Sequence, residues 1–178
     1  MTSPMTRFLL CALLLTALSC RSRTDESEGT VILSVSDFDG LPVAVSVNLG
    51  PFQIEELTLS NLPKSPTGQT GELQTIEMRS YEVTYRRLDR GTRTPPPLVE
   101  VLFGNVPVGG TTVYNNLPFI RSAQLAAQPL LDLGSLGRDT ETGSVVIPLR
   151  VTMRFFGRTL AGDDIVSNTA SFDLDVVP

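Results

Sequence analysis

The chain contains no histidine and no tryptophan among its 178 residues. Without histidine, Ser-His-Asp and Cys-His catalysis and the histidine-containing zinc sites are excluded. Without tryptophan, the chain lacks the strongest stacking platform for sugars and nucleobases. It has two cysteines, Cys11 and Cys20. We expect neither a disulfide nor a bound cofactor, since a chain of this length can bury a sufficient core without such staples.

Positive charge is also scarce. The net charge is −5, and Lys64 is the one lysine beside thirteen arginines. Mild acidity favours solubility and argues against binding to nucleic acid or to anionic lipid through basic residues. We therefore expect no nucleic-acid partner.

The N-terminus carries the most informative pattern. Arg7 precedes an apolar run from Phe8 to Leu18. That run is about half of the ~20 residues that a membrane-spanning helix needs. Its length and its flanks are those of a signal peptide, which we assign to residues 1–19.

The segment Ala17-Leu18-Ser19-Cys20 resembles the lipobox of bacterial lipoproteins. The resemblance implies cleavage after Ser19 and a diacylglycerol on the sulfur of Cys20, which becomes the first residue of the mature protein. Arg21 follows, where lipoproteins retained in the inner membrane carry Asp, so the resemblance favours the outer membrane. The protein is then expected to face the periplasm or the cell surface.

The mature chain would have 178 − 19 = 159 residues, enough for one domain and a short linker. Residues 21–30 are almost entirely polar and offer nothing to anchor them to a core. We predict a lipidated flexible tether at 20–30 and a single domain at 31–178.

Alternating apolar and polar residues dominate that domain and predict β-strands. Expected strands are 31–36, 43–48, a strand with Leu57 and Leu59 on one face, 81–86, 147–155 and 170–176. The last two read as a hairpin, with a connection at 157–164 and outward arginines facing outward aspartates. The residues 120–127 suggest a short helix or an irregular edge, and Pro129 would end a helix there.

The segment Tyr81-Glu82-Val83-Thr84-Tyr85-Arg86 is similar to a strand of fibronectin type III domains. Together with about seven short strands separated by turns, it predicts an all-β fold, an immunoglobulin-like antiparallel β-sandwich. We expect Tyr81, Tyr85 and Tyr114 to be core or half-buried strand residues, not a binding platform.

Three groups of acidic residues were weighed as sites. The Asp37-Phe38-Asp39-Gly40 sequence has the spacing of part of a calcium loop but reads better as a turn that ends a strand. Glu55 and Glu56 would face opposite sides of a strand. Asp163 and Asp164 fall in the hairpin connection, and nothing indicates the cleft that two catalytic carboxylates need.

Two further segments were weighed in the same way. Lys64 lies near Ser60 and Ser65, but a solvated lysine is a better interpretation than a Ser-Lys dyad. The prolines 95–97 favour a polyproline conformation, which a partner could bind, but a stiff loop or a sheet edge is the simpler interpretation. No catalytic, metal-binding or cofactor-binding residue is therefore assigned.

The sequence thus predicts a non-enzymatic envelope lipoprotein that is held on the membrane by its lipid anchor. Its β-sandwich would bind an envelope protein or act as a spacer, through loops or an exposed edge strand. A carbohydrate-binding module and an envelope hydrolase that uses carboxylates are the alternatives.

Overall fold

The computed structural model describes residues 29–65 and 71–178. The predicted signal peptide and cleavage site at Ser19, the predicted lipidation site Cys20, and the tether as far as residue 28 lie outside the described residues.

The last two residues that the sequence analysis gave to the tether pack against the domain. Gly29 is buried, and a Cβ on it would stand 2.5 Å from Cδ1 of Ile165. The carbonyl of Thr30 accepts a hydrogen bond from the backbone N–H of Lys64 (2.9 Å), and its hydroxyl accepts one from Gln74 (2.7 Å). Gly29 and Thr30 thus contact the domain, through residues distant in sequence, just before its first strand begins at Val31.

Strands make up most of the described chain. They are β1 (Val31–Asp39), β2 (Ala44–Ser46), β3 (Phe52–Pro63), β4 (Ile76–Arg87), β5 (Leu98–Val101), β6 (Asn105–Val106), β7 (Thr111–Ile120), β8 (Ile147–Thr159), β9 (Asp164–Val166) and β10 (Ala170–Val177). The helices are short: the 3₁₀ helices η2 (Val47–Leu49) and η3 (Glu72–Gln74), and the α-helices α2 (Ser122–Leu125) and α3 (Leu130–Leu136).

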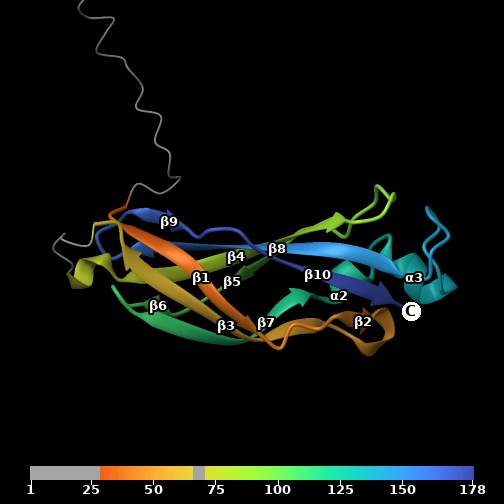
Figure 1. The fold of residues 1–178 in the computed structure, drawn as a ribbon, viewed down its shortest axis with the longest axis horizontal. Coiled ribbons are helices and arrows are strands. Elements are labelled where there is room, and N and C mark those ends of the chain that lie inside the picture. Colours follow the sequence, from red (N-terminus) through yellow and green to blue (C-terminus); the bar gives the residue numbers. More distant parts are fainter. Residues whose placement is uncertain (1–28, 66–70) are drawn as a thin grey trace, which may run out of the picture.

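The strands form two sheets that pack as a sandwich (Figure 1). The smaller sheet has the order β1-β3-β7, and the larger follows β2-β10-β8-β4-β5, with β6 pairing with β4 and β9 with β8. The predicted all-β sandwich class is confirmed. One pairing departs from the predicted antiparallel pattern, since β2 runs parallel to β10 with Val45 opposite Val176.

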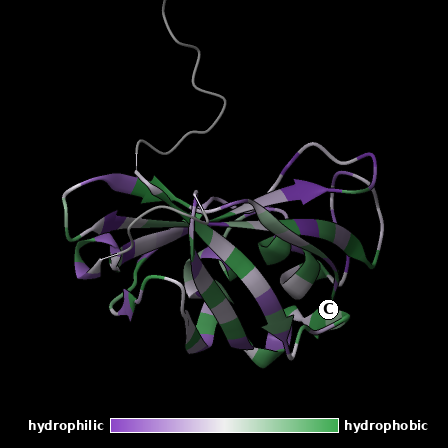
Figure 2. Ribbon diagram, turned by 60° about the vertical axis from the view of Figure 1, so that its left-hand side comes forward, coloured by the Kyte–Doolittle hydropathy of each residue, from purple (hydrophilic) through white to green (hydrophobic). Residues whose placement is uncertain are grey.

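Alternation along the strands places apolar residues between the sheets, as the bands of colour in Figure 2 show. In β8 every second residue from Ile147 to Phe155 is fully buried. Aromatic rings join the sheets: Phe119 of β7 meets Phe172 of β10 edge-on, with ring centres 5.3 Å apart. This interior is the single core of the domain.

The tyrosines of β4 also join the sheets. Tyr81 and Tyr85 are 1% and 9% exposed, and their hydroxyls donate to the carbonyls of Pro118 and Phe119 on β7. Tyr114 is 8% exposed. The prediction that all three tyrosines are core or half-buried strand residues is confirmed.

The predicted C-terminal hairpin exists, with a longer first strand and a divided second strand. β8 continues to Thr159, and the returning chain pairs with it first as β9 and then as β10. The predicted cross-strand charge pair is present: Arg150 binds Asp173 through two hydrogen bonds of 2.7 and 2.9 Å.

Three predicted boundaries near the N-terminus need correction. β1 does not end before Asp37 but runs to Asp39, because a register shift between Val35 and Asp37 keeps it paired with β3. The turn begins at Gly40, whose φ of 67° suits glycine. The predicted strand 43–48 is only three residues long, after which η2 begins.

A short helix does form within 120–127, as predicted, but the helical region continues beyond Pro129. α2 is a single turn, and Pro129 does not close the helical region but stands at the N-cap of α3. Proline is tolerated there because the first residues of a helix donate no intrahelical hydrogen bond. Leu130 and Leu133, three residues apart on α3, are fully buried.

In the described ranges, we find no helix that is both long enough and apolar enough to cross a membrane.

Candidate functional site at the α3 end

The two ends of the sandwich differ in construction. The described chain enters at one end, beside β9, and the helices α2 and α3 and the C-terminus lie at the other (Figure 1). The loops 88–97 and 137–146 lie at the same end as α3, because they follow β4 and precede β8. We call this region the α3 end.

A charge cluster with a buried centre joins these two loops. We call it the Arg87 cluster: Arg87, Asp89, Asp139 and Glu141. Arg87 Nε and Nη2 donate to the two carboxylate oxygens of Asp89 at 2.7 and 2.5 Å, and Nη2 also donates to Asp139 at 2.9 Å. The side chains of Arg87 and Asp139 are 2% and 0% exposed. Removing Arg87 would leave the buried Asp139 carboxylate without its cation.

Glu141 attaches the second loop to the first. Its carboxylate accepts hydrogen bonds from the backbone N–H and hydroxyl of Thr92 and from the backbone N–H of Arg93, at 2.6 to 3.1 Å. It lies 3.7 Å from Nη1 of Arg87. These contacts fix the loops 88–97 and 137–146 to each other.

The cluster shifts the acidity of its carboxyl groups. Burial alone raises the pKa of Asp139, but hydrogen bonds from Thr142 and Arg87 outweigh it and bring the pKa to about 2. The hydrogen bond from Arg87 lowers the pKa of Asp89, and the hydrogen bonds from Thr92 and Arg93 lower that of Glu141. All three groups are therefore carboxylates at neutral pH, so they act as acceptors and not as general acids.

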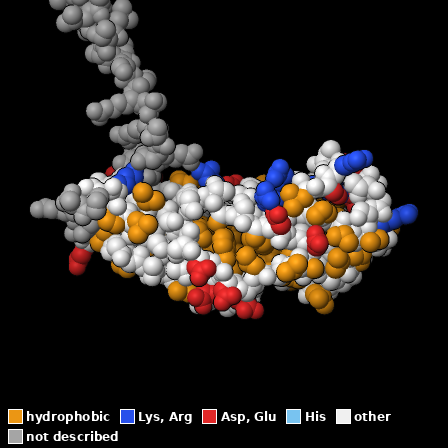
Figure 3. All heavy atoms as spheres, in the orientation of Figure 1, with side chains coloured by type: hydrophobic (Ala, Val, Ile, Leu, Met, Phe, Trp, Pro, Cys, Tyr) orange, Lys and Arg blue, Asp and Glu red, His pale blue; other side chains and the backbone are white. Residues whose placement is uncertain are grey.

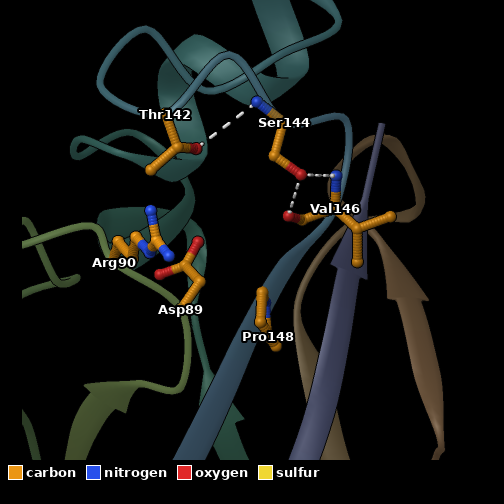
Figure 4. A pocket seen from close by; sticks show the side chains of 6 residues that line it. All are labelled: Asp89, Arg90, Thr142, Ser144, Val146 and Pro148. Atoms are coloured by element: carbon orange, nitrogen blue, oxygen red, sulfur yellow. Dashed lines mark hydrogen bonds between the residues drawn. The ribbon is translucent and has the colours of Figure 1, made fainter.

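An open hollow of about 390 Å³ lies beside the cluster (Figure 4). Asp89 and Arg90 stand on one side of it, and Ser144 and Val146 on the other. The Ser144 hydroxyl donates to the carbonyl of Val146 and accepts from its N–H. That hydroxyl is committed to the loop backbone, so no side-chain base takes its proton.

Exposed leucines lie at or next to a second hollow, of about 320 Å³, between η2 and α3: Leu131 lines it, and Leu49 and Leu136 each follow a lining residue, Asn48 and Ser135. We call them the leucine rim: Leu49 on η2 and Leu131 and Leu136 on α3, with 80%, 47% and 60% of each side chain exposed. Helix α3 lies close to η2, since a Cβ on Gly134 would stand 3.1 Å from Cγ2 of Val47. Figure 3 shows hydrophobic side chains gathered at this end of the molecule.

The acidic pairs weighed from the sequence do not come together as sites. Asp37 and Asp39 each accept a hydrogen bond from the next backbone N–H, and Glu55 and Glu56 are exposed on β3. Within residues 29–65 and 71–178, no group of three or more acidic or cysteine side chains is placed to hold a metal ion.

The other acidic pair lies at the turn between β8 and β9. Asp163 receives a hydrogen bond from the Thr159 hydroxyl, and Asp164 lies 3.7 Å from Nε of Arg158. Both carboxylates therefore serve the turn and an exposed ion pair.

Of the two serines near Lys64, Ser60 is not placed to form a dyad with it. Ser60 is a buried residue of β3, and Lys64 lies four positions further along the extended chain, about 13 Å away. Ser65 is exposed beyond the strand. The proline segment 95–97 forms the connection before β5, as predicted, with Pro95 buried and Pro96 and Pro97 exposed.

Neither the Arg87 cluster nor the leucine rim was predicted from the sequence. Asp139 followed by Thr142 is a spacing typical of a side-chain-capped turn, and this was the only available signal. Arg87 and Asp139 stand 52 residues apart, so their pairing depends on how β4 and β8 align.

Comparison of the chain with known protein families, with curated proteins and with solved structures finds no match.

Proposed function

We propose that this protein is a non-enzymatic envelope lipoprotein, anchored through Cys20 after cleavage behind Ser19, whose sandwich binds another envelope protein. The lipobox resemblance supports the anchor and, through Arg21, the outer membrane. One acyl chain gives marginal membrane attachment and two or more make it stable.

One observation carries the binding role: the two ends of the domain are unequal. The described chain begins at Gly29, which packs near Ile165 and β9, while the leucine rim and the fixed loops lie at the other end (Figure 1). An anchor that precedes Gly29 would hold the first end near the lipid and leave the α3 end free to meet a partner.

The chemistry of the rim favours a protein partner. Leucine side chains on a fixed frame offer apolar contact area, which protein interfaces use at their centres. A sugar site would need a row of exposed aromatic rings, whereas the three tyrosines are buried and, among the described residues, Phe103 is the one large exposed aromatic side chain. The Arg87 cluster supports the rim indirectly by holding the neighbouring loops.

The anchor is tested by fractionation. Replacing Cys20 with Ala should move the protein from the membrane to the soluble fraction, because the acceptor sulfur is lost. Cys11→Ala is the matched control and should leave the protein on the membrane, since that residue leaves with the signal peptide. Unchanged membrane association of Cys20→Ala would overturn the anchor.

The binding surface is tested by photo-crosslinking in the native envelope. A photoreactive residue at Leu136 should give a discrete protein adduct, and the adduct should disappear when Leu49 is replaced with Asp. Leu73 is the control, since it is a leucine of similar exposure (65% against 60%) on η3, away from α3. The same adducts from both positions, or none from Leu136, would overturn the assignment.

A further inference from the structure

The turn after β1 contains the one Asp-Gly sequence of the chain, Asp39-Gly40, and the chain has no Asn-Gly sequence. An aspartate in this position can form a ring with its own main chain, because the nitrogen of the next residue can attack the carboxyl carbon. Glycine favours this attack, since it has no side chain to obstruct its nitrogen. The motif therefore points to a chemical modification of Asp39.

The structure holds the two reacting groups in contact. The backbone N–H of Gly40 donates a hydrogen bond to Oδ1 of Asp39 at 2.7 Å. Oδ1 is bonded to the carboxyl carbon Cγ, so this contact also brings the nitrogen close to the carbon that it would attack. Holding reacting groups together in advance removes much of the entropy cost of the reaction.

Water has access to both residues. Asp39 and Gly40 are exposed, and Asp39 is the last residue of β1, opposite Glu56 of β3. Gly40 has a φ of 67°, and a Cβ on it would stand 2.7 Å from Cβ of Glu55. The fold therefore requires glycine at the position where glycine also makes the preceding aspartate most reactive.

Asp37 provides a comparison two residues earlier. The backbone N–H of Phe38 donates to Oδ1 of Asp37 at 2.9 Å, so the hydrogen bond is nearly the same. Phe38 carries a side chain, however, and its ring packs edge-on against Phe172 with ring centres 6.2 Å apart. Phe38 also lies within the strand pairing, opposite Leu57. Its nitrogen is therefore obstructed and fixed, unlike the nitrogen that follows Asp39.

We propose that Asp39 is a site of spontaneous isomerisation to isoaspartate, which proceeds in the folded protein through a cyclic succinimide. The Gly40 nitrogen forms a bond to Cγ of Asp39, and the protonated carboxyl group loses its hydroxyl, which leaves as water with the proton of the nitrogen. A second water molecule then opens the ring. Addition at Cγ regenerates aspartate.

Addition at the main-chain carbonyl carbon of Asp39 gives the other product. The original peptide bond to Gly40 breaks, and the chain continues through the former side chain as isoaspartate. One water is lost and one is gained, so the mass is unchanged and no other reactant is needed. The main chain gains one carbon at the last β1–β3 pair, at the start of the loop 40–43 that leads to β2.

Incubation of the folded full chain in water enriched in the heavy oxygen isotope tests the proposal. Each ring opening places one heavy oxygen in the new carboxyl group, and fragment-ion mass spectrometry locates it at position 37 or 39. Electron-induced fragmentation distinguishes isoaspartate from aspartate by the extra main-chain carbon. Asp39→Glu is the matched control, because it keeps the charge but would have to close a larger and less favourable ring.

Asp39 should gain the isotope about tenfold faster than Asp37, because only its attacking nitrogen is unobstructed. Isoaspartate should accumulate at position 39 while the strand circular dichroism stays unchanged, and Asp39→Glu should abolish the label there. The folded chain should react no more slowly than the chain unfolded in guanidinium chloride, because the fold already holds the reacting groups together.

Equal labelling at Asp37 and Asp39, no label at Asp39, or a reaction at Asp39 many-fold slower in the folded than in the unfolded chain would overturn the proposal. The test uses neither the anchor nor the leucine rim, so its result is independent of the proposed function.

Discussion

Arg87 and Asp139 carry opposite charges in a place where almost no water reaches either side chain. Desolvation opposes both charges, and the hydrogen bonds from Arg87 and Thr142 to Asp139 offset it. Such a pair adds little net stability compared with apolar residues, but it is costly to break from one side. Its contribution here is to fix two loops in one arrangement.

Replacing Arg87 with Met should lower the free energy of unfolding by about 3–5 kcal/mol, because Asp139 is left buried without its cation. Chemical denaturation at neutral pH measures the loss. Arg150→Met is the matched control, since Arg150 also binds an aspartate bidentately but at the surface, where ion pairs contribute little. If the two variants lost equal free energy of unfolding, burial of the ion pair would not explain the effect at Arg87.

The same aspartate makes stability depend on acid. Its pKa of about 2 in the fold lies below its ordinary 3.8, so its stabilisation is complete above about pH 5 and is lost as the pH falls toward 2. The loss is about 2 kcal/mol. Asp139→Asn should flatten the dependence of the free energy of unfolding on pH between about 5 and 2. Asp173→Asn, measured in ~0.5 M salt, is the control and should leave that dependence unchanged, because salt screens exposed ion pairs.

At the scale of elements, the pairing of β4 with β8 organises the larger sheet. It runs from Ile76–Thr159 to Arg87–Leu149, with a register shift between Met78 and Ser80. Gly157 lies opposite this shift, and a Cβ on it would stand 2.6 Å from Cγ2 of Ile76. Glycine is therefore required there by close approach of the neighbouring strand.

Gly157→Ala should lower the free energy of unfolding by about 1–3 kcal/mol, because the added methyl forces a shift in packed strands. Thermal and denaturant unfolding measure the change. Gly71→Ala is the control: a Cβ at Gly71 meets nothing within 4 Å, so its effect should stay within about 0.5 kcal/mol. If Gly157→Ala were as stable as the control, β4 would be able to shift and accommodate the added methyl group without a loss of stability, which would contradict this prediction.

The alternation of apolar residues predicted the elements that depend on burial alone. β4, β8 and β10 were found because one face of each is buried, and a period of two is the direct consequence. The lengths were predicted less well: β1 and β8 extend beyond the clean pattern because a neighbouring strand continues to pair with them. α3 was missed because Pro129 suits both the end of one helix and the start of another.

At the scale of the whole molecule, the tyrosines report whether the two sheets stay together. Burial raises the pKa of Tyr81, of Tyr85 and of Tyr114 above the ordinary value of 10.0. The neutral ring is favoured in the fold, whereas the unfolded chain ionises near pH 10. Stability is therefore complete below pH 10 and falls as the pH rises above it.

Alkaline titration should show no tyrosinate absorbance from the folded protein near pH 10, and a cooperative rise once the sheets separate. The chain unfolded in denaturant is the control and should titrate near 10.0, its ordinary value. Since these are all the tyrosines of the chain, a reversible signal near pH 10 with intact strand circular dichroism would contradict their burial.

The all-β class and the buried faces of the longest strands follow from the amino-acid sequence alone, because residue periodicity reflects burial directly. The sequence also contains the segment resembling a lipobox on which the proposed anchor at Cys20 rests. Three features are seen only in the folded chain: which strands share a sheet, the position of β5 at the edge of the larger sheet, and the contact between Arg87 and Asp139 across 52 residues. These features depend on strand order and register, which join residues distant along the chain and leave no local period to detect.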